Sequence, residues 1–172
     1  HPDPIIIGKD VNQYRINFSD HYFKFSVEKL QQVAPQELYL QKNKILYKFI
    51  SSRLTFALDR SGYYSLNNVN GFIPLDFGNT IETTLAILNS RVMQYFYQNN
   101  FFTLKVLRGN IERLPIKLIR KETQNKLTRL VRLISSEESQ HSIDCRETVE
   151  DIIFHEYNIK DRDAYSISDS AC

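Results

Sequence analysis

The spacing of apolar residues changes along the chain, and this change most constrains the fold. Up to about residue 77, apolar side chains alternate with polar ones, as in Tyr14, Ile16 and Phe18, which is typical of strands with one buried face. From about residue 80 they recur every three or four residues, the period of a helix. Strands followed by helices predict an α+β protein with a β-rich lobe and a separate helical part.

The β-rich part shows several turn signals. Residues 44–75 read KILYKFISSRLTFALDRSGYYSLNNVNGFIPL, which predicts strands linked by turns. Ser61-Gly62 predicts a hairpin, and Asn70-Gly71 is a second candidate turn. Before this segment, Pro35 is suited to the first turn of a short helix.

A long apolar helix is predicted over residues 80–98, with Asn79 or Thr80 as its cap. Its main stripe has helical spacing and consists of Ile81, Leu85, Leu88, Val92 and Phe96. A second stripe of Ala86, Met93 and Tyr97 widens the apolar face, which indicates burial between two layers. Asn89 falls at the edge of that face, so we expect its amide to bond the backbone of a neighbouring loop.

The last part of the chain shows two amphipathic helical patterns joined by a short polar link, which together predict an α-hairpin. The first is expected near residues 121–138. The second is expected to begin at Asp144, with Glu147 completing a capping box, and to end at Asn158 in a left-handed conformation. The predicted organisation is a β-rich lobe over residues 1–116 with one buried helix, the α-hairpin over residues 117–160, and a flexible acidic tail over residues 161–172.

Charge is distributed unevenly between the two ends of the chain. Residues 136–172 contain ten acids and three bases, a net charge of −7, whereas residues 1–135 contain nineteen bases and ten acids, a net charge of +9. The bases form one cluster within residues 42–60 and another within residues 105–132. A basic body with an acidic end indicates a polyanionic partner for the body, although the second cluster could equally be the solvated face of a helix.

Several classes of function lack their sequence signals. The chain has no glycine-rich phosphate loop, no G-x-S-x-G, no acid-x-Lys pair and no Asn-Pro-Pro-aromatic stretch, which favours binding over catalysis. No apolar run approaches the length of about 18 residues that a membrane span requires. A start at His1 and a single methionine indicate an excised domain of a larger protein.

The cysteine content indicates a reducing compartment. Two cysteines, Cys145 and Cys172, are far apart in the chain, which is unlike a disulfide scaffold and fits a cytoplasmic protein. His141, Cys145 and His155 could be imagined as metal ligands. No C-x-x-C pair accompanies them, so a helix with incidental histidine and cysteine is the preferred interpretation.

Residues 44–75, followed by LAILNSRVMQYFYQNNF and LRGNIERLPI, resemble the TaqI-like C-terminal specificity domain. This is the target recognition domain of bacterial N6-adenine DNA methyltransferases and of fused restriction–modification enzymes. The opening IIIGKDVNQYRI is similar to the glycine-basic-Asp-x-x-x-Tyr segment that precedes such domains. The closing ETVEDIIFHEYNI resembles the family's final helix, with Asn158 where the family usually has glycine.

The resemblance implies a division of labour between domains. A separate methyltransferase domain of the same polypeptide would bind S-adenosylmethionine and methylate a flipped adenine, and the parent protein could also carry an endonuclease. The present chain would bind duplex DNA and select the target sequence, with no cofactor or catalytic residue of its own.

Candidate DNA contacts follow from the basic residues in or beside the β-rich lobe. Contacts to the DNA backbone are expected from Lys42, Lys44, Lys48, Arg53, Arg60, Lys105 and Arg108. Base reading needs paired donors and acceptors, and the candidates are Arg53, Arg60, Asn67 and Asn68. Tyr63 and Tyr64 could reach phosphate or sugar, although one of the two is expected to pack in the hairpin core because strand neighbours alternate faces.

The DNA interpretation predicts that charge reversal at Arg53 and Arg60 weakens binding more than reversal at Arg129 and Arg132. The competing interpretation is a helical protein-interaction module in which the acidic α-hairpin is the active part. RNA binding is a third, weaker interpretation, because no strand resembling K/R-G-F-G-F-V is present.

Overall fold

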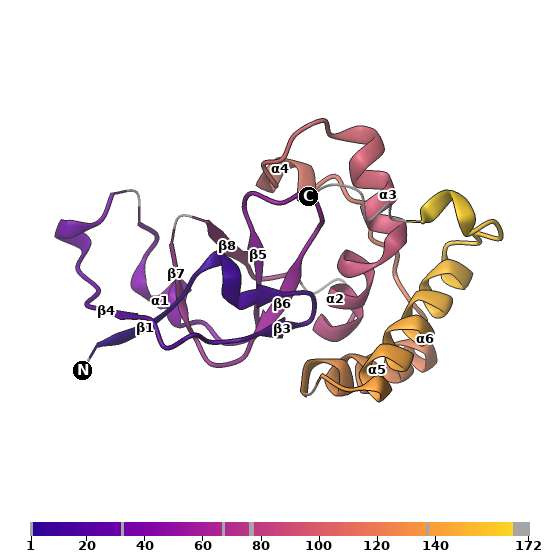
Figure 1. The fold of residues 1–172 in the computed structure, drawn as a ribbon, viewed down its shortest axis with the longest axis horizontal. Helices are drawn as coiled ribbons and strands as arrows, with labels where there is room; N and C mark the ends of the chain where they lie inside the picture. The colour runs from indigo at the N-terminus through magenta and orange to yellow at the C-terminus, as the bar shows by residue number, and fades with distance from the viewer. Residues whose placement is uncertain (1, 32, 67, 76–77, 137, 167–172) are drawn as a thin grey trace.

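Three small sheets build the N-terminal part of this computed structural model, which describes residues 2–166 except residues 32, 67, 76–77 and 137 (Figure 1). In the most buried sheet, β5 (Lys44–Lys48) lies between β6 (Phe56–Asp59) and β8 (Val69–Phe72), and all pairings are antiparallel. Ile45, Leu46 and Phe56 are fully buried. Ile45 and Phe56 belong to the main apolar cluster and Leu46 to a second one, so β5 is buried on both faces rather than on one. The overall architecture is the expected α+β.

In the other two sheets, every strand except β1 is only two residues long. β1 (Asp3–Ile6) pairs antiparallel with β4 (Tyr22–Phe23) and parallel with β7 (Tyr64–Ser65), while β2 (Val11–Asn12) pairs with β3 (Arg15–Ile16). Along the chain, the 3-10 turn η1 (Gly8–Asp10) lies between β1 and β2, while the 3-10 turn η2 (Val27–Lys29) and helix α1 (Gln36–Leu40) lie between β4 and β5. Helix α1 follows Pro35, as the sequence predicts.

The two predicted turns are used differently from the expectation. Ser61-Gly62 does not close a hairpin, because β6 pairs with β5 whereas β7 pairs with β1. The turn instead passes the chain from one sheet to another. Gly62 is required there: its φ is +81°, and a Cβ atom would lie 2.7 Å from the Leu40 carbonyl oxygen. Asn70 and Gly71 lie inside β8, so the second turn prediction is wrong.

The single helix predicted over residues 80–98 is two helices, α2 (Ile81–Asn89) and α3 (Arg91–Asn100). Ser90 has an extended ψ of 154° and separates them. Its hydroxyl accepts from the Met93 backbone N–H at 3.3 Å and donates to the Ile87 carbonyl at 2.7 Å, so it satisfies backbone groups of both helices. Thr80 caps α2, which confirms one of the two proposed caps.

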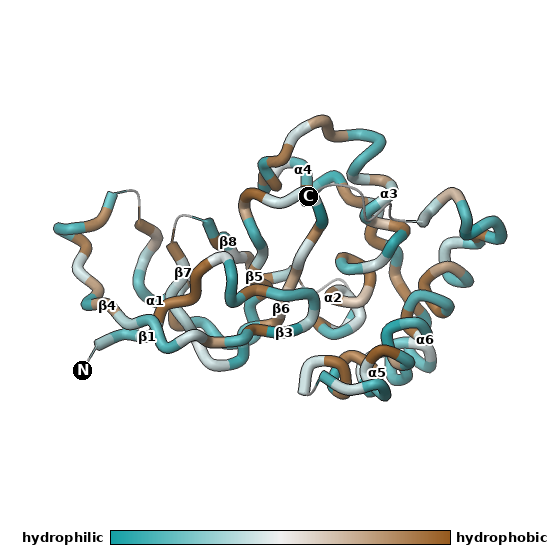
Figure 2. The backbone as a smooth tube through the Cα atoms, in the orientation of Figure 1, coloured by the Kyte–Doolittle hydropathy of each residue, from teal (hydrophilic) through white to brown (hydrophobic). Residues whose placement is uncertain are grey.

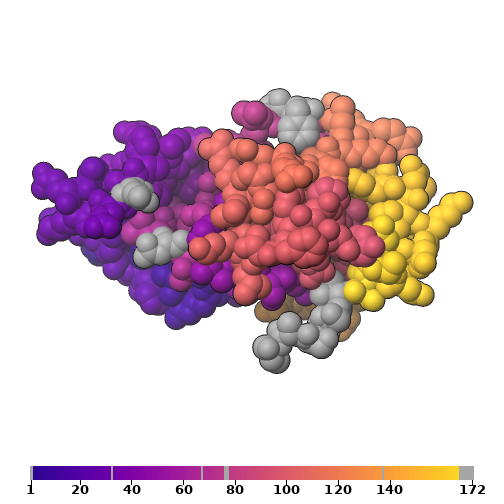
Figure 3. Space-filling model, turned by 90° about the horizontal axis from the view of Figure 1, so that it is seen from above, coloured from indigo at the N-terminus to yellow at the C-terminus, as the bar shows by residue number. Residues whose placement is uncertain are grey.

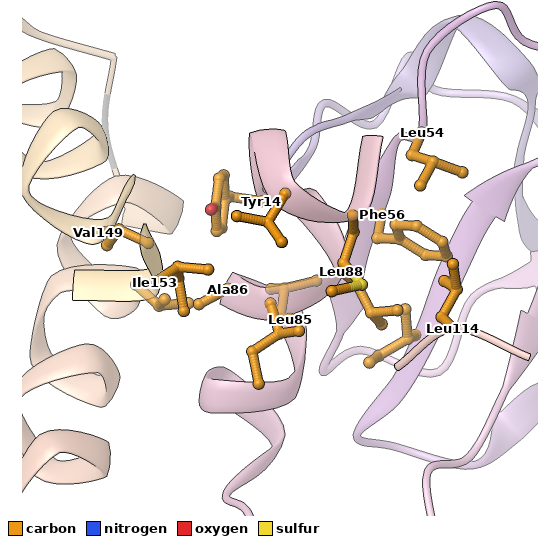
Figure 4. Packing of buried hydrophobic residues seen from close by; sticks show 14 of the residues in the cluster. Tyr14, Leu54, Phe56, Leu85, Ala86, Leu88, Leu114, Val149 and Ile153 are labelled. Atoms are coloured by element: carbon orange, nitrogen blue, oxygen red, sulfur yellow. The ribbon is translucent and has the colours of Figure 1, made fainter. Parts of the chain in front are cut away.

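Helix α2 is buried between two layers, as its double stripe predicts. Figure 4 shows Leu85 and Leu88 of α2 between two groups of side chains. Phe56 lies on the side of the sheet, and Val149 and Ile153 of the hairpin lie on the other side. All belong to one apolar cluster. The β-rich lobe and the α-hairpin therefore share a core.

The hairpin consists of α5 (Lys121–Ser136) and α6 (Gln140–Glu156), preceded by the short helix α4 (Arg108–Ile111). Brown and teal alternate along α5 and α6 in Figure 2, as expected for amphipathic helices. Ser139, rather than Asp144, caps α6 through reciprocal bonds with Ser142. A serine pair one turn earlier thus satisfies the first N–H groups, and Asp144 lies inside the helix.

The end of α6 follows the prediction. Asn158 has a φ of +55°, and the Ile159 N–H donates to the Phe154 carbonyl at 3.0 Å. Beyond it, η3 (Asp163–Tyr165) places the Tyr165 ring 4.3 Å from that of Tyr95, between ring centroids. Tyr165 also packs edge-on against Phe154 of α6, and the Arg162 guanidinium lies 4.9 Å from the centroid of the same Phe154 ring. Figure 3 shows the yellow C-terminal segment against the body of the molecule, so this part of the predicted tail contacts α3 and α6 through Arg162 and Tyr165. Residues 167–172 of the predicted tail lie outside the described residues.

Candidate nucleic-acid interface

The predicted basic residues do not form one surface. Lys48 and Arg53 line a common groove. Lys42, Lys105 and Arg108 are exposed at other places, and Arg108 is ion-paired with Glu112 one turn later in the chain, at 2.6 Å. The backbone of Lys105 forms an isolated bridge with Ile50, beside the loop that carries Arg53.

Lys44 is a buried structural residue. Its ammonium group lies 2.5 Å from the Asp59 carboxylate and donates to the carbonyls of Tyr39 and Gln41. The two side chains are 5% and 0% exposed. Because the Lys44 charge is neutralised inside the lobe, Lys44 does not belong to the surface that can meet DNA.

Arg60 shares an acid with the second basic cluster. Its guanidinium group lies 2.7 Å from Glu82 Oε1, and the Arg132 guanidinium lies 3.0 Å from the same oxygen. Burial opposes ionisation of Glu82, but a backbone hydrogen bond and these two guanidinium groups hold its pKa below the usual range. Because both guanidinium groups bind the same carboxylate, comparing charge reversal at Arg60 with charge reversal at Arg132 does not separate the lobe from the hairpin.

One of the two tyrosines is buried, as predicted, but it lies on β7 in the sheet with β1 and β4 rather than in a hairpin. Tyr64 is 1% exposed, packs against Tyr39 at 5.5 Å between centroids, and accepts a hydrogen bond from Gln36. Tyr63 is half-buried and stacks on Phe18 at 5.1 Å. Asn68 is exposed, whereas Asn67 lies outside the described residues.

The most basic concavity lies where the β-rich lobe meets the hairpin, and we call it the junction groove. It has a volume of about 290 Å³. Four cations and one acid line it: Arg15, Lys48, Arg53, Arg146 and Glu138. The remaining lining residues are neutral and polar: Asn12, Gln13, Asn17 and Thr55. Such a surface suits an anion and offers amide groups beside the charges.

Arg146 is fixed in the groove by packing. Its guanidinium group lies 5.5 Å from the centroid of the Tyr14 ring and donates to the Gln13 carbonyl at 3.4 Å. Burial, together with the charges of Arg15 and Arg53, lowers the pKa of Arg146 from its ordinary value. Like charges thus gather here with too little acid to balance them.

Arg15 also faces the groove and is less well satisfied. One terminal nitrogen lies 2.9 Å from Glu138, and the Arg15 side chain is only 12% exposed. Its Nε is the one buried side-chain N or O atom without a hydrogen-bond partner among the residues that the structure describes. Sequence reasoning missed Arg15 and Arg146, since Arg15 lies outside both basic clusters and Arg146 lies within the acidic segment.

Among the residues described, the pair of His141 and Cys145 on α6 is not part of a metal site. Cys145 Sγ lies 3.9 Å from His141 Nε2 on α6, but the described part of the chain holds no group of three His, Cys, Asp or Glu residues in a metal-binding arrangement. None of the described helices is both long and apolar enough to span a bilayer.

The family model for the TaqI-like C-terminal specificity domain matches residues 3–116, which is more than half of the 172 residues. The chain belongs to this family. No curated protein matches it. Membership of the TaqI-like specificity domains indicates DNA target recognition in restriction–modification enzymes. The match covers the β-rich lobe with α2, α3 and α4, and the hairpin that carries Arg146 lies beyond it.

Proposed function

We propose that this chain recognises a specific sequence in duplex DNA on behalf of a restriction–modification adenine methyltransferase. A separate methyltransferase domain of the same polypeptide would bind S-adenosylmethionine and perform the chemistry in the bacterial cytoplasm. The observation that carries the proposal is the junction groove, where four cations meet one acid in a TaqI-like specificity domain.

Backbone contacts and base reading would come from different parts of the lobe. Lys48 and Arg53 lie on the groove and would position phosphates, and the exposed Lys42 and Lys105, which lie outside the groove, would be further contacts. Arg53 and Asn68 are exposed and carry the donors and acceptors that bases require. Tyr63 is half-buried, so it would present its hydroxyl edge rather than its ring face.

Fluorescence anisotropy with duplex DNA at two salt concentrations tests the proposal. We expect weak binding that falls steeply between about 50 and 200 mM salt, because phosphate contacts release counterions. The double variant Lys48→Gln/Arg53→Gln should bind at least about tenfold more weakly. The matched control is Lys121→Gln/Arg129→Gln, which removes two charges from exposed positions on α5 outside the groove.

Absence of binding at both salt concentrations would contradict the proposed function. Equal losses in the two double variants would instead show that only net charge matters, and the groove would no longer be the DNA surface.

The hairpin-centred alternative, a protein-interaction module, finds less support. The hairpin directs Leu127, Val131 and Ile153 into the shared core, and within the described parts of α5 and α6 the exposed large apolar side chains are Leu133 and Ile143. Two separate residues do not form an extensive apolar docking face. Capture of a partner subunit by a chain without DNA affinity would nevertheless favour this function.

A further inference from the structure

The turn between α5 and α6 places an acid at the mouth of the basic groove. Glu138 precedes the cap of α6 and contacts Arg15 at 2.9 Å. Its own side chain is 79% exposed, so the carboxylate lies at the mouth of the groove rather than in its floor. An exposed ion pair of this kind is weak, because water screens it and both side chains lose freedom.

The groove remains undersatisfied even with Glu138 in place. Arg15 uses one terminal nitrogen for Glu138, while its buried Nε has no partner in the described structure. Arg146 is stacked on Tyr14 and bonds a single carbonyl, Gln13 O, at 3.4 Å. Guanidinium groups present several donors in a fixed fork. The Arg15 and Arg146 guanidinium groups therefore have donor capacity that an anion with several acceptor oxygens would use once Glu138 moves away.

We propose that the junction groove binds a backbone phosphate of duplex DNA, and that Glu138 is an intramolecular anion that occupies Arg15 until the phosphate replaces it. The inference rests on the proposed DNA-binding function. It also gives the hairpin, which lies outside the matched family region, a direct part in DNA binding. Arg146 would contact the phosphate from α6, while Arg15, Lys48 and Arg53 would contact it from the lobe.

The charges in the groove explain why replacement of Glu138 by a DNA phosphate would be favourable. The groove carries four cationic side chains against the single charge of Glu138. A phosphodiester supplies one negative charge of the same sign and two free oxygens that can accept from Arg15 and Arg146 together. Exchange therefore keeps the charge balance while supplying acceptors for donors that Glu138 does not reach. Departure of Glu138 costs little, since its carboxylate is already largely hydrated.

Removal of the competing acid provides the sharpest test. Glu138→Gln should bind duplex DNA about two- to fivefold more tightly than the wild type at low salt, because no ion pair has to be broken first. The matched control, Glu122→Gln, removes the same charge from an exposed position on α5 outside the groove. Its effect measures what net charge alone contributes. A gain in affinity cannot result from misfolding, so the test holds even where other variants are unstable.

Arg146→Gln tests the hairpin's contact. We expect about tenfold weaker binding and a loss of about one unit from the slope of log K against log salt. Arg129→Gln on α5 is the control, and Arg146→Lys should recover part of the affinity because it restores the charge. Thermal unfolding of each variant confirms that the fold is kept.

The outcomes separate this inference from the function on which it rests. If the wild type binds duplex DNA but Glu138→Gln behaves like Glu122→Gln, Glu138 is not the competing anion and the inference fails alone. If folded Arg146→Gln binds like Arg129→Gln, the hairpin does not contact the phosphate and the inference again fails alone. If the wild type does not bind duplex DNA, the proposed function itself fails.

Discussion

At the scale of single residues, the identity of a lysine or arginine in the sequence does not tell whether its charge is open to DNA. Lys44 and Lys48 are four positions apart on one strand, yet Lys44 is buried against Asp59 and Lys48 lines the junction groove. The Asp59 carboxylate also accepts from the backbone N–H groups of Ser61, Gly62 and Tyr63. Lys44 thus completes a structural site that holds the turn after β6.

We expect Lys44→Met to lower the free energy of unfolding by about 3–5 kcal/mol, because removal of one partner leaves a buried carboxylate uncompensated. Urea unfolding measures this change. The control, Lys42→Met, alters an exposed neighbour and should shift the free energy by no more than about 0.5 kcal/mol. Similar values for the two variants would mean that the buried pair contributes little to stability.

At the scale of elements, a single polar side chain at the end of helix α2 joins this helix to strand β6. Asn89 is the last residue of α2 and is 4% exposed. Its Oδ1 accepts from the Phe56 N–H at 3.0 Å, and its Nδ2 donates to the Phe56 carbonyl at 2.9 Å. The predicted bond to backbone is confirmed, although the partner is strand β6 rather than a loop.

Asn89→Ala should therefore destabilise the fold by about 1–3 kcal/mol, since it leaves the buried Phe56 N–H without its acceptor. The Phe56 carbonyl keeps the hydrogen bond that it accepts from the Tyr14 N–H at 2.8 Å. Chemical denaturation provides the measurement. Asn99→Ala on α3 changes an exposed asparagine whose amide bonds only a helical carbonyl, that of Tyr95, at 2.8 Å, and it should be nearly neutral. A small effect at Asn89 would show that water replaces the amide at the strand edge.

At the scale of the whole molecule, Glu150 joins the hairpin to the rest of the protein. Both of its carboxylate oxygens accept from the Arg91 N–H, at 3.1 Å each, at the start of α3. Burial raises the pKa of Glu150 to about 7, with Glu147 adding to the rise, while the Arg91 hydrogen bond and the charges of Arg91 and Arg53 oppose it. Burial raises the pKa of Tyr14 above its ordinary value, and the nearby charge of Glu150 adds to the rise.

The pKa of Glu150 predicts a pH dependence of stability. A pKa raised in the folded state above its ordinary 4.5 favours folding while the group is protonated, so this contribution is complete below about pH 4.5 and is lost as the pH rises to about 7. Glu150→Gln should remove the loss, which makes the variant more stable than the wild type above pH 7 by up to about 3 kcal/mol. Urea unfolding at pH 4.5 and pH 8 measures the difference. Asp144→Asn, on the exposed face of α6, should show no such trend.

Local sequence patterns determined the kinds of element and several of their ends. The change from alternating to helical spacing indicated an α+β chain, and the confirmed Thr80 cap and Asn158 C-terminal turn depend only on neighbouring residues. The break at Ser90 was missed because apolar periodicity continues across it while the backbone changes direction. The Ser139 cap was missed because Asp144 and Glu147 carry a similar local signal.

The amino-acid sequence by itself determined the fold class, the amphipathic hairpin and the family resemblance that the TaqI-like match confirms. Only the tertiary structure decided which cations are free, because that depends on residues distant in the chain. Asp59 neutralises Lys44, Glu82 links Arg60 with Arg132, and the packing of α6 on the lobe brings Arg146 beside Arg53. Charge interactions act through space over a few ångströms, so their partners are set by the fold and not by sequence spacing.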